Sequence, residues 1–347
     1  MTQVITLTID GFKQGGAQEV YRLIIPILVK RFKKVRLIVL NTTTLDLDLP
    51  KFENLEVFKL KANRLTKFGE YVKFRRIIRT YEDQIIISTL FISHIWTALS
   101  KINATKLIWL EQNTYHSRSL SQWKLLSLLS KRVEKVICVS RDILNISKEN
   151  KLRNIILAPN PINYSNFNLN TRRTIDFVFV GRMTEQKNPY LLLKAFELIH
   201  LNEKTESVLH LIGDGPMLGE VIDYATNHGF SKNCVFHKAL NINETLRILS
   251  KSKVLISTSH IEGFGLARLE ALAVGCCVIS TDTGGARDFL PLENNIGTVI
   301  VDFDENELAK KMLSLLNKDY WKKDTIKKRV HFASKFTATS VLDSWLN

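Results

Sequence analysis

The stretch IDFVFVGRMTEQKNPYLLLKAF (175–196) decides how this chain folds. It begins with an almost continuously apolar run, as expected for a parallel strand that is covered on both faces of its sheet. From Pro189 onward, apolar side chains recur with a helical period, and Asn188 followed by Pro189 is a favourable helix start. The stretch therefore predicts a buried strand, a loop that contains Arg182 and Lys187, and a helix.

The same alternation of apolar runs and helix-like stretches continues in both directions. A Pro- and Asn-rich segment without periodicity, 159–173, divides the runs into two series. The candidate strands are 4–9, 35–40, 55–60, 84–88, 106–111, 135–140 and 154–159, then 175–181, 208–213, 234–239, 253–258, 276–281 and 298–302. We therefore expect an α/β protein with two Rossmann-like, doubly wound domains that face a central cleft.

Length and charge support two domains with different partners. The chain has 347 residues, and domains of roughly 150 residues are common. Residues 1–168 contain 27 Lys and Arg against 13 Asp and Glu, whereas residues 169–347 contain 22 against 21. A basic first half predicts an anionic partner: a nucleic acid, a membrane surface or a phosphorylated substrate.

Composition argues against several classes of protein. No apolar run reaches the ~18 residues that a membrane-spanning helix needs, and the first residues lack the basic start of a secretory signal. The four cysteines have neither metal-ligand spacing nor the density of a disulfide framework. A reducing, cytoplasmic environment fits these features.

The stretch HIEGFGLARLEALAVGCCVIS (260–280) carries the strongest indication of chemistry. It predicts a helix over 264–273 whose glycine-containing start offers free N–H groups to an anion. The glycines are Gly263 and Gly265. Glu262 and Glu270 would lie ~12 Å apart along a helix, which suits a ligand with a sugar, a diphosphate and a ribose. The alternative is that Glu262 caps the helix and Glu270 is a solvated charge.

Arg182 and Lys187 can both lie in the loop at the end of their strand. A planar guanidinium and a mobile ammonium together suit a diphosphate; the alternative is two ordinary surface cations.

The following strand leads into GDGPML (213–218), where Leu218 occupies the third glycine position of a dinucleotide-binding fingerprint. This argues against a nicotinamide dehydrogenase and favours a tight turn around Asp214.

In chain order, these segments resemble retaining glycosyltransferases of the GT-B fold: the family-4-like glycosyl transferases group 1, typified by bacterial lipopolysaccharide, capsule and mannosyl transferases. The strings that carry the resemblance are GGAQEV, CVS, PNPI, FVFVGRMTEQKNPYLLLKAF, LIGDGP, EGFGLARLEALAVG and TDTGGARDFL. The resemblance implies an acceptor-binding domain over 1–165 and a donor-binding domain over 166–333. It also implies that a terminal helix, 334–347, packs back on the first domain.

The resemblance implies roles residue by residue. Arg182 and Lys187 match the pair that binds the donor diphosphate, Glu270 matches the carboxylate that holds the ribose, and Glu262 matches the one that faces the transferred sugar. Further matching positions form the phosphate site and the first-domain loop near the acceptor: Gly263, Phe264, Gly265 and Leu266, then Gly15 and Gly16. The donor would be a nucleotide diphosphate sugar and the acceptor a saccharide or a lipid-linked one.

The resemblance implies no metal and no other cofactor. Two Asp-x-Asp strings, 46–48 and 302–304, have the residue types of a metal site, but each is too short a pattern to predict one. The second is expected to open a helix.

One position departs from the family's pattern. Related sequences often read Glu-His-Asn where this chain has Glu111, Gln112 and Asn113. We expect His116 to serve in place of the missing imidazole. The alternative is that Gln112 replaces it as a neutral hydrogen-bonding group.

The first half contains a strongly basic segment. Between residues 59 and 79 it has eight Lys and Arg against one acid, Glu70. Apolar residues at spacings of three and four predict an amphipathic helix over 66–80, of a kind that favours anionic membrane surfaces. A core-packed helix with a solvated basic rim is the alternative, here and in a second basic segment, 117–135. Membrane contact would place the protein on the cytoplasmic face of the inner membrane.

Two other functions compete with glycosyl transfer. A nucleic-acid-binding protein would fit the sequence pI of about 9.6, but we find no stacking platform and no known binding module. A nucleotide-sugar epimerase or phosphorylase on the same fold would use similar residues and differ in its product.

Overall fold

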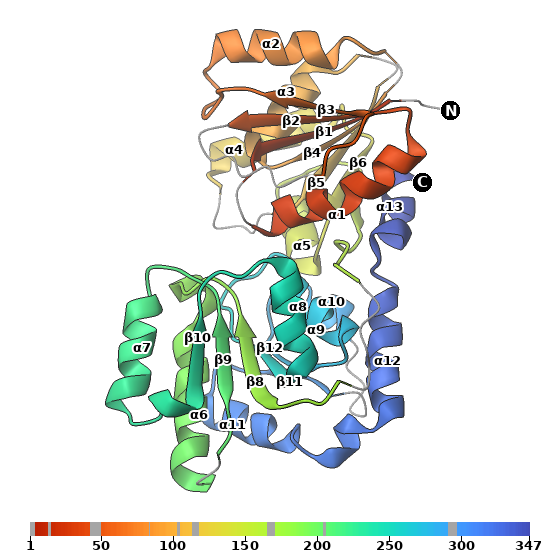
Figure 1. Ribbon diagram of the computed structural model, residues 1–347. Coiled ribbons are helices and arrows are strands. Elements are labelled where there is room, and N and C mark those ends of the chain that lie inside the picture. The colour runs from red at the N-terminus through yellow and green to blue at the C-terminus, as the bar shows by residue number, and fades with distance from the viewer. Residues whose placement is uncertain are drawn as a thin grey trace. The chain divides into compact units, whose positions relative to one another are not determined.

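The chain forms two compact units, Met1–Ile162 with Ala338–Asn347, and Asn163–Thr337. The computed structural model describes residues 4–12, 15–41, 50–82, 84–102, 105–112, 118–164, 171–203, 206–290 and 297–347. Each unit is built on one parallel sheet with helices on its faces (Figure 1). This confirms the two doubly wound α/β sheets that the sequence predicts.

The first unit has a seven-stranded sheet in the order β3-β2-β1-β4-β5-β6-β7. Its strands are β1 (Val4–Gly11), β2 (Lys34–Asn41), β3 (Leu55–Lys59), β4 (Gln84–Thr89), β5 (Lys106–Glu111), β6 (Lys135–Cys138) and β7 (Ile155–Leu157). Residues 4–9 of β1 are all buried. Both faces of this central strand are covered, which explains why it carries no charge before Asp10.

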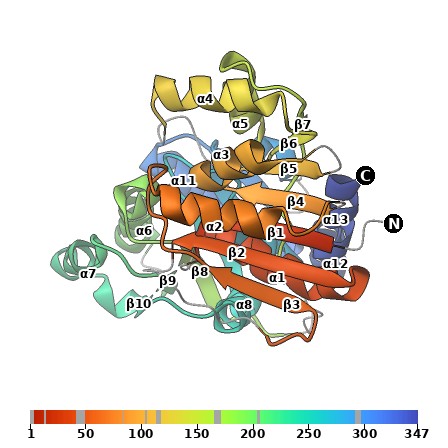
Figure 2. The ribbon, with the colours of Figure 1, turned by 90° about the horizontal axis from the view of Figure 1, so that it is seen from above.

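Helices cover the sheet of the first unit. They are α1 (Gly16–Arg31), α2 (Phe68–Ile78), α3 (Phe91–Ser100), α4 (Leu120–Ser130), α5 (Arg141–Glu149) and α13 (Ala338–Leu346). Three of them, α2, α3 and α4, lie side by side with α3 in the middle (Figure 2). The helix expected over 66–80 is thus α2, which is two residues shorter at both ends, and the second basic segment, 117–135, contains α4. A capping box of Ser119 and Gln122 fixes the start of α4.

The last helix of the chain belongs to the first unit. α13 packs against α1, and its Trp345 side chain is fully buried. An exposed ion pair, Arg31 Nη1 to Asp343 Oδ1 at 2.6 Å, joins the same two helices. Leu346, the last residue of the helix, is only half-buried, although a terminal helix that packs back on the first unit predicts burial of both residues.

The second unit has a six-stranded sheet in the order β10-β9-β8-β11-β12-β13. Its strands are β8 (Ile175–Val180), β9 (Leu209–Ile212), β10 (Cys234–His237), β11 (Ser252–Ser257), β12 (Cys277–Thr281) and β13 (Thr298–Val301). Its helices are α6 (Pro189–Glu203), α7 (Leu218–Asn227), α8 (Ile242–Lys251), α9 (Leu266–Ala273), α10 (Ala286–Phe289), α11 (Glu305–Ser314) and α12 (Lys323–Ser334), with short 3₁₀ turns η2 (Glu185–Lys187), η3 (Ser231–Asn233) and η4 (Lys318–Trp321).

Strand order reverses at β8, which lies between β9 and β11. At such a point the connections leave in opposite directions, and the loops beyond the strands' carboxyl ends leave room for a ligand. The loops after β8, β9, β11 and β12 meet at this edge, and they contain the predicted site residues of the second unit except Leu266 and Glu270, which lie on α9.

Candidate functional site

The loops after β8 and β9 touch backbone to backbone. A Cβ atom on Gly213 would lie 1.9 Å from the carbonyl oxygen of Gly181, and one on Gly215 would lie 2.4 Å from that of Met183. Only glycine fits at either position. The amide of Met183 also donates to the carbonyl of Asp214 at 2.9 Å. The GDG segment is therefore a tight turn that shapes the loop after β8.

Lys187 forms an ion pair with Glu262, so the loop after β8 is bound to the loop after β11. Both side chains are largely buried, and Ser259 Oγ donates to the same carboxylate oxygen at 3.3 Å. Burial raises the pKa of Glu262, but Lys187, Arg268 and the hydrogen bonds outweigh it and hold that pKa below its usual range. Glu262 is therefore an anion held within the site.

Further hydrogen bonds fix the backbone on both sides of this ion pair. Thr258 Oγ1 donates to the carbonyls of Lys187 and Asn188, at 3.1 and 2.8 Å. Gln186 accepts from the amide of His260 at 2.9 Å and donates to the carbonyl of Ile261 at 3.0 Å. The side chain of Arg182, at the start of the same loop, is exposed. Lys187 is thus held in place, whereas Arg182 is free to reach a ligand.

Arg268 ties the loop after β11 to the loop after β12. Its guanidinium is almost completely buried. It donates to the carbonyls of Phe264 at 2.5 Å and Thr283 at 2.8 Å, to Ser280 Oγ at 2.9 Å, and to the carbonyl of Gly284. A single side chain on α9 therefore sets the shape of both loops.

Glycines leave room for this arrangement. Gly265 adopts φ +81°, and a Cβ atom there would lie 2.3 Å from the Arg268 guanidinium. A Cβ atom on Gly284 would lie 1.8 Å from the carbonyl oxygen of Glu262. A larger residue at Gly265 would displace the Arg268 guanidinium, and one at Gly284 would push the two loops apart.

The start of α9 lacks a side-chain cap. Gly265 occupies the capping position, and the first turn of the helix, beginning at Leu266, has no acidic residue. Gly263 and Phe264 precede it, and Phe264 is buried. Glu262 is paired with Lys187 instead of capping the helix, and Glu270 is buried within α9 instead of being solvated. The alternative interpretation, in which Glu262 caps the helix and Glu270 is a solvated charge, is therefore wrong.

In the first unit, Gly15 and Gly16 form the exposed start of α1. Gln18 Nε2 donates to the carbonyl of Gly11 at 2.9 Å.

Asp10, at the end of β1, accepts from the amides of Ile92 at 2.9 Å and Ser93 at 2.7 Å. Burial raises the pKa of Asp10 to about 6, although these two amides act to lower it.

A buried polar cluster lies at the end of β5. Glu111 accepts two hydrogen bonds from Arg118, at 2.5 and 3.0 Å, and the guanidinium lies over the ring of Trp123. His94 stacks on Trp109, and its Nδ1 lies 2.8 Å from Ser88 Oγ. Burial, with a smaller effect of Arg118, keeps the pKa of His94 well below its usual value. This imidazole is therefore neutral.

Of the two candidates for the missing imidazole, only Gln112 lies within the described residues; His116 lies outside them. Asn160 Nδ2 donates to Gln112 Oε1 at 3.5 Å. Asn160 belongs to the PNPI string, so this contact joins a segment that carries the family resemblance to the position at which the chain departs from the family's pattern.

Sequence reasoning missed Asp10, His94, Arg118 and Arg268. Asp10 directly follows a predicted strand, which is a usable signal. Arg268 lies inside the predicted helix 264–273 and His94 lies inside α3, and in both helices nothing in the local sequence distinguishes an inward-pointing polar residue from a solvated one.

The described residues contain no group of three or more His, Cys, Asp and Glu side chains that could hold a metal ion. Asp304, in the second Asp-x-Asp string, caps α11 by accepting from the amide of Glu307 at 2.7 Å; the first string lies outside the described residues. No helix in the described part of the chain is long and apolar enough to cross a membrane.

Comparison with known proteins places these features in a family. Residues 164–334 match the family described as Glycosyl transferases group 1. A Campylobacter jejuni enzyme, GalNAc-α-(1→4)-GalNAc-α-(1→3)-diNAcBac-PP-undecaprenol α-1,4-N-acetyl-D-galactosaminyltransferase, is 25% identical over 308 residues, or 85% of this chain and 83% of the relative.

Solved structures show the same fold. The crystal structure of Anabaena HepE in complex with UDP has a TM-score of 0.77 at 16% identity, with 98% of this chain and 97% of HepE covered. The lipopolysaccharide outer core galactosyltransferase WaaB, in its apo form, has a TM-score of 0.71 at 16% identity, with 99% of this chain and 98% of WaaB covered.

Proposed function

Because the chain belongs to the glycosyl transferases group 1 family and has the GT-B fold, we propose that it is a retaining hexosyltransferase of bacterial surface glycan synthesis. It takes a hexose or a related sugar from a nucleotide diphosphate sugar. It transfers this sugar to a saccharide or lipid-linked acceptor of a surface polysaccharide or lipopolysaccharide.

The observation that carries this proposal is the position of Lys187 and Glu262 at the switch point of the second sheet. The Lys187 cation, the exposed Arg182 in the same loop and the uncapped start of α9 offer positive charge and N–H groups suited to a diphosphate. The N–H groups near Gly263, Phe264, Gly265 and Leu266 contribute the backbone donors. Glu262 and Glu270 are carboxylates suited to the hydroxyl groups of the transferred sugar and of the ribose.

In the reaction, the bond from the anomeric carbon to the diphosphate oxygen breaks while the acceptor hydroxyl oxygen bonds to the same face of that carbon. The hydroxyl proton passes to the departing phosphate oxygen. Arg182 and Lys187 stabilise the charge that develops on the diphosphate, and the fixed loops hold the reactants in place. Lys187 exchanges Glu262 for phosphate when the donor binds, which frees Glu262 to accept hydrogen bonds from the sugar.

Residues of the first unit serve the acceptor side. Gly15 and Gly16 provide a loop without side chains that lets the acceptor approach the backbone closely. His116 or Gln112 supplies a hydrogen bond near the transferred sugar. The excess positive charge of this unit suits the phosphates of a lipid-linked acceptor and the anionic cytoplasmic face of the membrane, to which the enzyme binds peripherally.

A donor panel followed by product analysis tests this function. UDP-, GDP-, ADP- and CMP-sugars are compared by thermal shift, with UDP-sugars first because of the HepE complex. The correct donor at 100-fold its Kd should stabilise the protein by about 2.7 kcal/mol. NMR of the product should then show a new glycosidic bond with the anomeric configuration of the donor. An inverted linkage would contradict retention, and an epimerised or merely released sugar would contradict transfer.

A further inference from the structure

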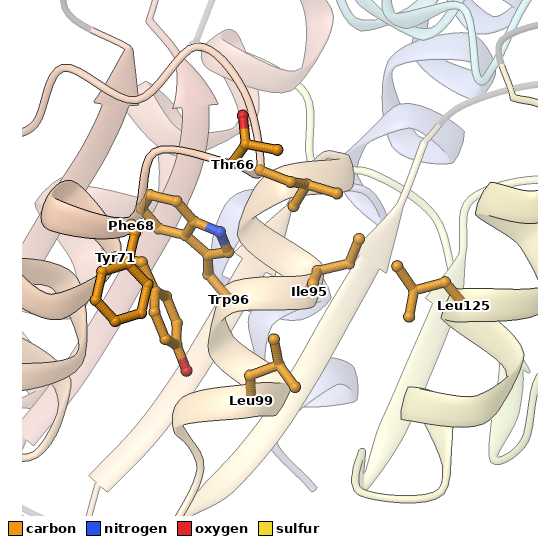
Figure 3. Close-up of a pocket in the computed structure, with 8 residues that line it drawn as sticks. Thr66, Phe68, Tyr71, Ile95, Trp96, Leu99 and Leu125 are labelled. Carbon is orange, nitrogen blue, oxygen red and sulfur yellow. The ribbon is translucent and has the colours of Figure 1, made fainter.

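Helices α2, α3 and α4, with the residues just before α2, form an apolar groove in the first unit (Figure 3). Its volume is about 320 Å³. The residues that line it are Leu65, Thr66, Phe68, Tyr71, Ile95, Trp96, Leu99 and Leu125. Thr66 supplies the only polar side chain apart from the Tyr71 hydroxyl and the Trp96 indole N–H, so the groove suits a hydrocarbon.

The floor of the groove is packed and preformed. Tyr71 meets the ring of Trp96 edge-on, with centroids 5.4 Å apart, and Phe74 packs against the same ring at 5.5 Å. Trp96 and Ile95 are almost fully buried, while Leu99 and Leu125 line the groove farther along (Figure 3). A ligand would therefore enter an existing space without rearranging the helices.

Large apolar side chains are exposed along this groove. Phe68 is 75% exposed, Leu99 44% and Val72 41%. Leu128, one helical turn beyond Leu125, is 61% exposed. Neighbouring exposed apolar residues of this size are uncommon on a surface that faces only water and indicate an interaction site.

Cations accompany the apolar residues on the same helices. Lys67 precedes Phe68, Arg75 lies one turn beyond Tyr71, and Lys124 precedes Leu125. All three side chains are exposed, and within the described residues none of them forms an ion pair. Glu70, the acid of α2, is engaged by Lys73 at 2.7 Å and by the amide of Lys61 at 3.0 Å. An apolar groove with an uncompensated positive rim matches the chemistry of an anionic lipid.

We propose that this groove binds an acyl chain of an anionic membrane phospholipid, while Lys67, Arg75 and Lys124 attract the anionic head groups of that lipid and of its neighbours in the membrane. The proposal deepens the peripheral membrane binding given above and rests on it. The groove has room for about ten groups of the size of a water molecule, which is enough for the end of one chain. A nucleic acid would leave this apolar lining uncovered, and a purely electrostatic membrane contact would leave it unused.

Trp96 provides a direct test, because bromine on an acyl chain quenches an indole only at close range. Vesicles of phosphatidylglycerol and phosphatidylethanolamine with brominated acyl chains should quench the fluorescence of the full-length protein more than unbrominated vesicles do. The Trp96→Phe variant should lose this additional quenching while still binding the vesicles. Brominated phosphatidylcholine alone should quench weakly, since it lacks the net negative charge.

Surface variants provide a second test that does not disturb the packed floor. Phe68→Ser and Leu99→Gln should each lower vesicle affinity, the former about tenfold, as expected for loss of one inserted aromatic side chain. The matched control is Leu201→Ser, which changes a leucine that is 60% exposed on α6 of the second unit. Neutralising Lys67, Arg75 and Lys124 together should cost more than tenfold, since each contributes ~1 kcal/mol.

Several outcomes would overturn the proposal. Equal quenching by brominated and unbrominated vesicles, or equal effects of Phe68→Ser and Leu201→Ser, would mean that no acyl chain enters the groove. Quenching that needs added polyprenyl phosphate would assign the groove to the acceptor lipid instead. Transfer to a short water-soluble acceptor is measured for every variant, because it should not change. If the wild-type protein itself fails to transfer, the proposed function fails, whatever the vesicles show.

Discussion

Lys187 and Glu262, 75 positions apart in the sequence, form an ion pair between the loops after β8 and β11. Both side chains are largely shielded from water, so the Coulomb attraction between them is stronger than on an open surface. It also means that the site cation already has an anionic partner before any donor arrives. Donor binding must therefore replace a carboxylate by a phosphate at Lys187, and the predictions for this site depend on that exchange.

Removal of either cation should impair transfer. Arg182→Ala and Lys187→Ala should each lower turnover about 10²-fold, because a preorganised charge for the leaving diphosphate is lost. Steady-state kinetics with the identified donor measures this. Lys194→Ala, an exposed lysine on α6, is the matched control and should behave like the wild type. Near-normal turnover of both site variants would remove the diphosphate assignment.

The two glutamates should separate by what they bind. Glu270→Ala should weaken binding of the nucleoside diphosphate alone, because its proposed partner is the ribose. Glu262→Ala should leave that affinity nearly unchanged or raise it, since Lys187 no longer has a competing carboxylate, and it should lower sugar transfer. Calorimetric titration of the nucleotide, combined with rate measurements, distinguishes the two. Equal loss of nucleotide affinity in both variants is the result that contradicts these roles.

Fold and site differ in how far the sequence predicts them. Buried parallel strands such as β8 are continuous apolar runs, so their number and order along the chain can be read directly. The residues that follow them, Arg182 and Lys187 among these, are then placed at the carboxyl edge of the sheet. The partners of these side chains cannot be predicted in this way, because spacing along the chain carries no information on contacts between distant loops. Lys187 and Glu262 were expected at neighbouring parts of a ligand, and the structure pairs them with each other.

Arg268 shows a second limit of sequence reasoning. Within LARLEALA it looks like a solvated charge on an amphipathic helix, yet its guanidinium is buried against the carbonyls of Phe264, Thr283 and Gly284. Only the tertiary structure provides these acceptors, which come from two loops.

Arg268 should therefore act as a positioning residue. Arg268→Met should leave buried carbonyls without donors, at about 1–3 kcal/mol for each group left unsatisfied, and should loosen both loops. We expect the KM for the donor to rise more than kcat falls, and Arg268→Lys to restore part of the lost affinity. Thermal unfolding and kinetics of both variants measure this. Loss of stability with an unchanged KM would reduce Arg268 to a purely structural role.

Chelation tests whether side chains and the start of α9 neutralise the donor by themselves. Activity should survive EDTA, because Arg182, Lys187 and backbone N–H groups supply the positive charge that a divalent ion provides elsewhere. The assay compares EDTA-treated enzyme with and without added magnesium or manganese. Complete inactivation that either metal reverses would show that the reaction needs a bound ion.

Asp10 should make the stability of the first unit depend on pH. Folding raises its pKa from 3.8 to about 6, chiefly by burial. Between these values the folded state binds more protons at Asp10 than the unfolded chain does. The contribution of protonated Asp10 to the free energy of unfolding is therefore complete below about pH 4 and is lost as the pH rises through 6. A salt-bridged carboxylate, whose pKa is lowered by folding, has the opposite pH dependence.

The Asp10→Asn variant isolates this effect, since an amide keeps an acceptor for one of the α3 amides and cannot titrate. The free energy of unfolding of the wild type, relative to this variant, should fall by on the order of 1–3 kcal/mol between pH 4 and pH 7. Urea unfolding at several pH values, followed by tryptophan fluorescence, measures it. Asp223→Asn, which changes an exposed carboxyl group on α7, is the matched control. If the curves of wild type and Asp10→Asn run parallel over this range, the Asp10 carboxyl titrates no differently in the folded protein than in the unfolded chain.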